Sequence, residues 1–334
     1  MLKKICLDEL KFIVQLYNQG SVALPQGKNL ENAPSKLLIS VPPGHDTDVK
    51  NAVAVKIDPS IVVEINSHTK FIEDSVEFLR NKRVATRIAC PSEIVYQSIV
   101  TGRQKRGWRN PDSIEVGNKA ETGSTARRYA NSIFAKEKGL RHSYRICPIE
   151  GGNMLTGTDF IIVGKDALYA TMGVFSVDDT EAKALIGYDF GIAPEHVYPV
   201  EQPGEYHLDM SMLLLTDQVV LLKQETDCQK KALIDQTICD LRRYGFIVIV
   251  DLIFVGPTHN FLNGEFIVGA DGKKVFLTNA PFVPNSELEE TFRQTINDIL
   301  AAHGFAPIQV EFIQDSLSLR DKAGLACRMK GIGV

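Results

Sequence analysis

The sequence lacks the features that mark a membrane-spanning, disulfide-built or zinc-ribbon protein. No apolar run approaches the ~18 residues that a transmembrane helix needs. The six cysteines are scattered, and none stands in a C-x-x-C pair, so a zinc ribbon is excluded and a disulfide scaffold is disfavoured. We therefore expect reduced thiols in a cytoplasmic protein, with inert packing as the default role of any one cysteine.

A strong charge of one sign is also missing. The net charge of -4 argues against bulk attraction to nucleic acid or to an anionic membrane. The first ten residues carry charges inside what would be the apolar part of a secretory signal, so they indicate an amphipathic helix instead. No motif for a metal, nucleotide or flavin is present, and we expect no cofactor. We divide the chain into a helical extension, residues 1–35, and one main domain, residues 36–334.

What the chain does contain is one unit of a helix followed by a strand, repeated five times. The predicted helices cover residues 70–80, 126–138, 180–190, 229–244 and 286–303, and the predicted strands cover 84–89, 144–148, 197–200, 246–250 and 308–312. Gly139, Gly245 and Gly304 follow three of these helices, where a left-handed C′ glycine is expected. Thr180 and Ser286 are the predicted N-caps of two of them.

A short polar segment follows each of these units. The five segments are 108–112, 150–153, 207–209, 260–263 and 325–327. The helices start about 50 to 57 residues apart, a period that is typical of repeat or propeller architectures. We therefore predict an α/β fold in which five units form a ring and the polar segments meet at its axis. The alternative is a doubly wound α/β sheet with a similar order of elements.

Three of the polar segments carry side chains that suit nucleophilic catalysis. Cys327 offers a thiol, His207 an imidazole, and Glu150 and Asp209 offer carboxylates, each close to an apolar run. A thiolate attacks only when its surroundings favour ionisation, and an imidazole can transfer protons near neutral pH. The pattern predicts a cysteine-nucleophile site assembled from distant parts of the chain.

These segments resemble those of the guanidine-modifying enzyme superfamily. The resemblance is carried by E-G-G-N within residues 149–164, H-L-D within 206–217 and the late cysteine within 324–329. It is nearest to the arginine deiminase and dimethylarginine dimethylaminohydrolase branches. The resemblance implies the pentein fold, a five-bladed α/β-propeller with pseudo-fivefold symmetry.

The resemblance also implies roles for single residues. Cys327 becomes the nucleophile, His207 the general acid and base, Glu150 the carboxylate near the histidine, and Asp209 a guanidinium ligand. The implied reaction is hydrolysis of a small guanidine, such as arginine or a derivative, through an S-alkylthiouronium intermediate to a ureido product. Protein-bound arginine is a possible substrate. Amidinotransfer is an alternative, and a pentein that only binds a partner is an alternative of another class.

The chain departs from the superfamily pattern before residue 149. The superfamily carries a further guanidinium-binding aspartate in an early R-D or E-D segment, and we found no clean copy of it. Asp112 in W-R-N-P-D is the candidate by phase, although N-P-D is equally a turn signal. Asn153 and Arg109 complete the predicted substrate-binding set.

Two further polar groups allow more than one interpretation. The basic run 101–109 is first a solvated loop, second a substrate lid in which Arg109 binds an anion, and third a nucleic-acid contact. His45 lies in a P-P-G-H-D turn whose spacing fits no metal site. His259 and Asn260 lie in the fourth segment, either as a structural loop or as pocket lining.

Overall fold

The computed structural model describes most of the second half of the chain and shorter parts of the first half. The described residues are 8, 27–40, 48–65, 77–78, 83–87, 141–145, 147, 149, 151–203, 207–314 and 324–332. The predicted helix at the start of the chain and the predicted helix 126–138 lie outside them. So do Glu150, Asp112, Arg109 and the His45 turn.

The described residues form five three-stranded sheets and one two-stranded hairpin, β12–β13. The sheet orders are β17-β1-β2, β3-β4-β5, β6-β7-β8, β9-β10-β11 and β14-β15-β16. In every one of them the middle strand pairs antiparallel with the first strand and parallel with the third. The bounds are β1 (Lys36–Ser40), β2 (Val62–Ile65), β3 (Glu77–Phe78), β4 (Arg83–Arg87), β5 (Arg141–Arg145), β6 (Met154–Thr156), β7 (Ile161–Gly164), β8 (Val197–Val200), β9 (Met212–Leu214), β10 (Val219–Lys223), β11 (Ile247–Asp251), β12 (Val255–Gly256), β13 (His259–Asn260), β14 (Glu265–Val268), β15 (Lys274–Asn279), β16 (Gln309–Ile313) and β17 (Met329–Ile332).

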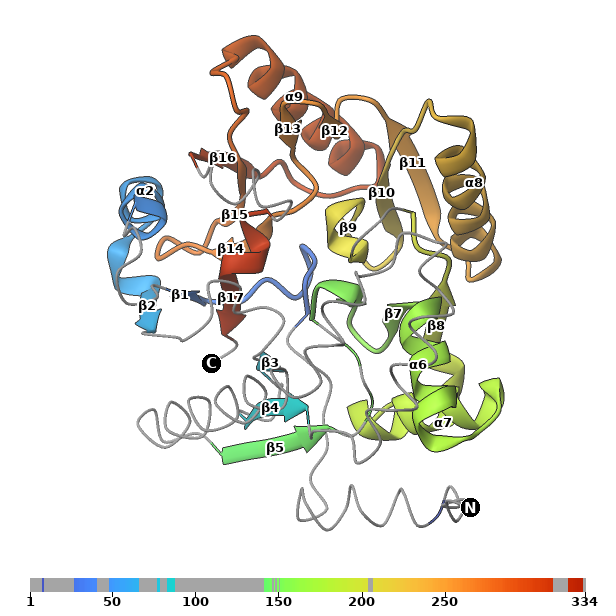
Figure 1. Ribbon diagram of the computed structural model, residues 1–334. Helices are drawn as coiled ribbons and strands as arrows, with labels where there is room; N and C mark the ends of the chain where they lie inside the picture. Colours follow the sequence, from blue (N-terminus) through green and yellow to red (C-terminus); the bar gives the residue numbers. More distant parts are fainter. Residues whose placement is uncertain are drawn as a thin grey trace.

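Parallel strands need a crossover, and helices supply it in four of the sheets. These helices are α2 (Asp48–Lys56), α6 (Lys165–Phe175), α7 (Asp179–Phe190), α8 (Cys228–Arg243) and α9 (Ser286–Ala302). In Figure 1 they lie at the rim, whereas β9, β14 and β17 lie toward the middle. The α/β class predicted from the sequence is therefore confirmed. Among the described helices, none combines the length and apolar character needed to cross a membrane.

Two of the middle strands, β7 and β10, contain continuous apolar runs because both of their faces are covered. All four residues of β7 are buried, as are the first four of β10. Such continuous apolar runs are typical of strands that lie between a layer of helices and a core.

Two of the helix predictions are confirmed in position, but their N-caps are corrected. Helix α7 is capped by Asp178, whose carboxylate accepts the N–H of Glu181 in a capping box, and not by Thr180. Helix α9 is capped by Asn285, one residue before the predicted Ser286. Gly245 and Gly304 have φ values of 91° and 80°, the left-handed conformation predicted after α8 and α9.

The predicted helix 70–80 is wrong at its end, because Glu77–Phe78 forms strand β3. The apolar residues of this stretch have helical spacing, and a strand of two residues is too short to show the alternation of apolar and polar residues that marks a strand. This error changes which residues of the first repeat correspond to the polar segments of the other repeats. In the described repeats the polar segment precedes the first strand of a sheet, so its equivalent in the first repeat is the stretch before β3. Residues 108–112 fall instead between β4 and β5.

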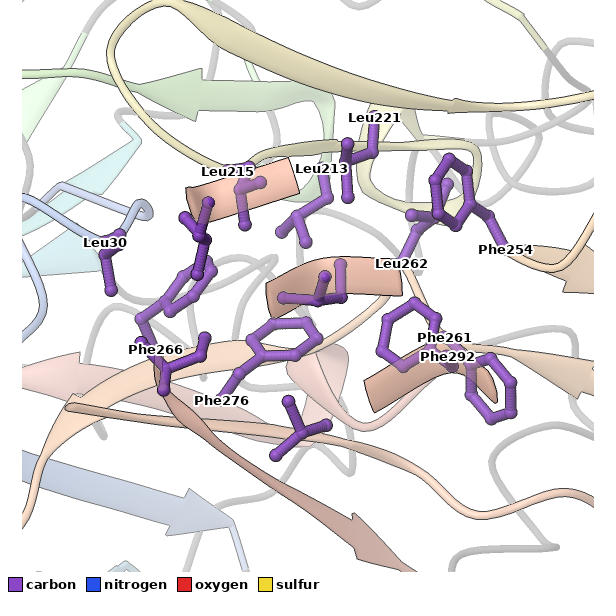
Figure 2. Close-up of a cluster of buried hydrophobic side chains, with 14 of the residues drawn as sticks. Leu30, Leu213, Leu215, Leu221, Phe254, Phe261, Leu262, Phe266, Phe276 and Phe292 are labelled. Carbon is purple, nitrogen blue, oxygen red and sulfur yellow. The ribbon is translucent and has the colours of Figure 1, made fainter. Parts of the chain in front are cut away.

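The sheets are joined to one another by shared cores. One cluster combines side chains of β9 and β10 with side chains of β14, β15 and α9, and Figure 2 shows Leu213, Leu221, Phe266, Phe276 and Phe292 from it. A second cluster joins the β6-β7-β8 sheet to β9 and β10, and a third joins β1 and β17 to β14 and β15. Strand β17 also contacts β3. The order of contacts therefore follows the order of the repeats.

Residues 27–34 belong to this body although they precede the first strand. The N–H of Lys28 donates to Thr156, the N–H of Leu30 donates to Leu215, and the carbonyl of Pro34 accepts the N–H of Val268. These three partners come from three different sheets. Leu30 is buried in the cluster that Figure 2 shows.

Candidate active site

Four short segments bring the polar residues of the sequence motifs to the first strands of their sheets. Three of the segments contain a single turn of 3₁₀ helix: η3 (Gly151–Asn153), η5 (Leu208–Met210) and η6 (Ala326–Arg328). The fourth, residues 260–263, precedes β14. The turn η3 packs against η5, so segments far apart in sequence meet.

Cys327 and Asp209 lie together, as the sequence predicts. The Sγ atom of Cys327 is 3.9 Å from Oδ2 of Asp209. Both side chains are buried, at 7% and 5% exposure. A carboxylate this close to sulfur and shielded from water favours a cationic guest beside the thiol.

His207 lies beside Asp209 at the start of a turn. The chain turns through η5, and His207 precedes it as the N-cap. Gly152 of η3 allows the approach, because a Cβ there would lie 2.5 Å from Nδ1 of His207 and 3.0 Å from Oδ1 of Asp209. The imidazole and the carboxylate therefore border the same glycine.

Glu150 directly precedes η3, and its own placement lies outside the described residues. The neighbouring backbone is well defined by its contacts. The carbonyl of Gly151 accepts a hydrogen bond of 2.8 Å from Nζ of Lys28, which is buried. Sequence reasoning missed Lys28, because nothing in its surroundings distinguishes it from a lysine of an appended extension.

Asn153 has partners that give it a structural role. Its Nδ2 donates to Oδ1 of Asp166 at 2.7 Å, and its Oδ1 accepts from Gln202 at 3.1 Å. Asp166 lies in the first turn of α6 and also accepts the N–H of Ala167. These bonds tie η3 to the start of a helix. The predicted contact between Asn153 and a substrate remains a prediction.

Asn263 is the residue that sequence reasoning missed at the centre of the site. Its Nδ2 is 2.9 Å from Oδ2 of Asp209 and 3.7 Å from Sγ of Cys327. Its Oδ1 accepts the N–H of Ala326, the residue before the cysteine, at 2.8 Å. The sequence carries one signal for it, since Asn263 ends the in-phase polar segment 260–263.

His259 belongs to the fold rather than to the site. Its Nε2 lies 3.1 Å from the carbonyl of Ile253, and its ring lies 4.7 Å from that of Phe261. Burial lowers the pKa of His259, and the hydrogen bond to Ile253 opposes this only in part. The residue is therefore held neutral in a packed loop. Asn260 donates to the carbonyl of Met210, so it braces η5. Of the two interpretations of this pair, the contacts favour the structural one.

Taken together, the described residues place a thiol, an imidazole and a carboxylate in one buried site. No group of three or more metal-ligating side chains gathers anywhere in the described part of the chain. The arrangement offers one small cationic group a carboxylate and a thiol 3.9 Å apart, with an imidazole bordering the same carboxylate.

Comparison with known proteins identifies the fold. No protein-family model and no curated protein matches the chain. Among solved structures, C. jejuni agmatine deiminase is similar, with a TM-score of 0.62 and 10% identity over 94% of this chain and 96% of that one. A variant of that enzyme with substrate bound gives a TM-score of 0.60 at 9% identity, over 94% and 96% of the two chains.

A third similar structure comes from another organism. Agmatine deiminase of Enterococcus faecalis gives a TM-score of 0.56 at 8% identity, over 94% of this chain and 96% of that one. Coverage is nearly complete in both directions, so the likeness concerns the whole arrangement of repeats. The chain therefore has the fold of the agmatine deiminases, and the resemblance to the guanidine-modifying superfamily is confirmed at the level of the fold.

Proposed function

We propose that the protein is a cysteine-nucleophile hydrolase that acts on the guanidine group of arginine or an arginine derivative. The observation that carries the proposal is the 3.9 Å separation between Sγ of Cys327 and Oδ2 of Asp209, with His207 beside the same carboxylate. The fold shared with agmatine deiminases supports it. Agmatine is therefore the first substrate to test.

In the proposed reaction, Asp209 accepts hydrogen bonds from the guanidinium and holds it over the sulfur. The thiolate of Cys327 attacks the central carbon, and the C–N bond to the leaving nitrogen breaks. His207 protonates that nitrogen, which departs as ammonia or an amine and leaves an S-alkylthiouronium. His207 then takes a proton from water, the hydroxide adds to the same carbon, and the C–S bond breaks. The products are the ureido compound and the free thiol.

The site also needs a carboxylate beside the imidazole of His207 and a second carboxylate that binds the guanidinium. We assign Glu150 to the histidine side, because it directly precedes η3, which packs on η5. For the second ligand, we propose that the five repeats close into a ring whose axis is lined by the stretch before β3. That stretch contains F-I-E-D-S, so Asp74 is the better candidate by phase, and Asp112 is the alternative. Asn153 and Arg109 stay secondary candidates.

The first experiment measures ureido product and ammonia from agmatine, arginine, a methylated arginine, a succinylated arginine and an arginine peptide. Replacing Cys327 by Ala is expected to lower turnover of any accepted substrate by about a thousandfold or more. Cys228, which is exposed on α8, provides the control: Cys228→Ala should retain wild-type turnover. Full activity of Cys327→Ala would sink the proposal.

Asp74→Asn and Asp112→Asn separate the two candidates for the second ligand. Loss of turnover in one variant, with wild-type turnover in the other, identifies the carboxylate. The same assay with added amines tests the alternative reaction, because a transferase forms a new guanidine on the acceptor and no ureido product. If the wild-type protein turns over nothing in this panel, the alternative of a pentein that only binds a partner gains ground.

A further inference from the structure

The fourth repeat supplies no group to the proposed mechanism, yet its Asn263 is completely buried beside the proposed nucleophile, Cys327, and the proposed guanidinium ligand, Asp209. We propose that Asn263 is a positioning residue that fixes Cys327 and Asp209 relative to each other. The inference rests on the proposed function and names the group that sets the geometry of the nucleophile.

The side-chain amide of Asn263 contacts two separate segments. Its Nδ2 donates to the carboxylate of Asp209 on η5 at 2.9 Å and lies 3.7 Å from Sγ of Cys327 on η6. Its Oδ1 accepts the N–H of Ala326 at 2.8 Å. One planar group therefore contacts the guanidinium ligand, the sulfur and the backbone that carries the sulfur.

An amide suits this position for a physical reason. The sulfur and the carboxylate oxygen are 3.9 Å apart, so a thiolate there faces a like charge. The Asn263 amide directs the positive ends of its N–H dipoles toward these two atoms, and it adds no net charge. Aspartate at the same place would offer no donor and a further negative charge. An apolar side chain would leave the N–H of Ala326 buried without its acceptor.

Asn263 is itself held in place by its neighbours. Its N–H donates to Oδ1 of Asn260 at 3.3 Å, and its carbonyl accepts from Nδ2 of Asn279 at 3.0 Å. Gly324 gives it room, since a Cβ at Gly324 would overlap the Asn263 amide. The side chain thus has little freedom to turn, which is what a preorganised site requires of a supporting group.

The test replaces Asn263 by Asp, which keeps an oxygen for the N–H of Ala326 and removes both donors. Alkylation of Cys327 by iodoacetamide is followed by mass spectrometry, with exposed Cys228 in the same molecule as the reference. We expect labelling of Cys327 to slow about tenfold relative to Cys228, since thiolate is the reactive form. With an accepted guanidine, kcat should fall roughly 10- to 100-fold and KM much less.

The matched control is Asn297→Ala. Asn297 makes comparable hydrogen bonds outside the site. Its Nδ2 donates to the carbonyls of Arg293 and Ile308, and its Oδ1 accepts the N–H of Ile308. These bonds join α9 to the residue before β16. This variant should lose thermal stability while its Cys327 labelling and kinetics stay at wild type. A role in folding alone predicts the same pattern for Asn263.

Asn263→Ala is the second variant, for the case in which the buried aspartate prevents folding. It should unfold cooperatively and still show a kcat reduced by about tenfold or more. Wild-type labelling and a kcat within about threefold of wild type in a folded Asn263 variant would overturn the proposal. If the wild-type protein accepts no guanidine, the proposed function fails, whereas the labelling of Cys327 still decides the role of Asn263.

Discussion

Gly152 leaves space for His207 and Asp209 where η3 meets η5. Any larger residue would place a carbon 2.5 Å from Nδ1 of the imidazole, well inside van der Waals contact. The ring of His207 is buried at this point and lies next to the carboxylate, so the neighbours have little room to give. A residue without a side chain is thus part of what positions the proposed acid and base.

Replacing Gly152 by Ala tests this at the scale of one methyl group. We expect turnover to fall about tenfold or more, because the imidazole must move, and stability to fall by about 1–3 kcal/mol from overpacking. Gly269→Ala is the control, since its Cβ would meet the exposed carboxylate of Asp271 at 3.1 Å and the carbonyl of Lys273 at an ordinary contact distance of 3.5 Å. Steady-state kinetics and thermal unfolding of both variants measure the effect. Equal turnover and equal stability of the two variants would show that the imidazole of His207 can move aside without loss of activity.

At the scale of elements, the segment 27–34 and the strand β3 were the hardest parts to predict. Residues 27–34 carry no periodic pattern, because their order comes from backbone bonds to Thr156 and Leu215 on distant sheets. Strand β3 has two residues, too few for alternation to show. Helices α7, α8 and α9 were predicted within one or two residues, since their apolar spacing and terminal glycines are local signals.

Leu30 provides a test of whether residues 27–34 belong to the folded body. Its side chain is 2% exposed and packs in the cluster of Figure 2. Leu30→Ala should lower the free energy of unfolding by about 2–4 kcal/mol, the cost of a cavity in a core. Val55→Ala on α2, where the side chain is 82% exposed, should change it by less than about 0.5 kcal/mol. Urea denaturation gives both values. A negligible effect of Leu30→Ala would indicate an appended segment.

At the scale of the whole molecule, neighbouring repeats are connected by polar bonds as well as by shared cores. Lys165, the first residue of α6, forms an ion pair of 2.6 Å with Asp240 on α8. The carboxylate of Asp240 is 1% exposed and also accepts the N–H of Glu201. The recurrence of the repeats was readable from sequence, whereas such bonds between them were not, because they join residues with no regular spacing.

Lys165→Met tests the contribution of this connection. Lys165→Met removes the shorter of two ion pairs of this buried carboxylate, which keeps Arg243 at 3.1 Å, so the free energy of unfolding should fall by about 2 kcal/mol. Lys231→Met is the matched control: Lys231 and Asp235 are also 2.6 Å apart, but both are more than half exposed. That variant should change stability by no more than about 0.5 kcal/mol. Similar losses in the two variants, measured by urea denaturation, would contradict the importance of burial.

The pairing of β1 with β17 has a consequence for how the protein is made. Residues 36–39 pair antiparallel with residues 329–332, so the first sheet is incomplete until residue 332 has left the ribosome. Cys327 lies on the turn that leads into β17. Cys327 therefore takes its place only when β17 pairs with β1, and a chain that stops before residue 324 would lack both this strand and this thiol.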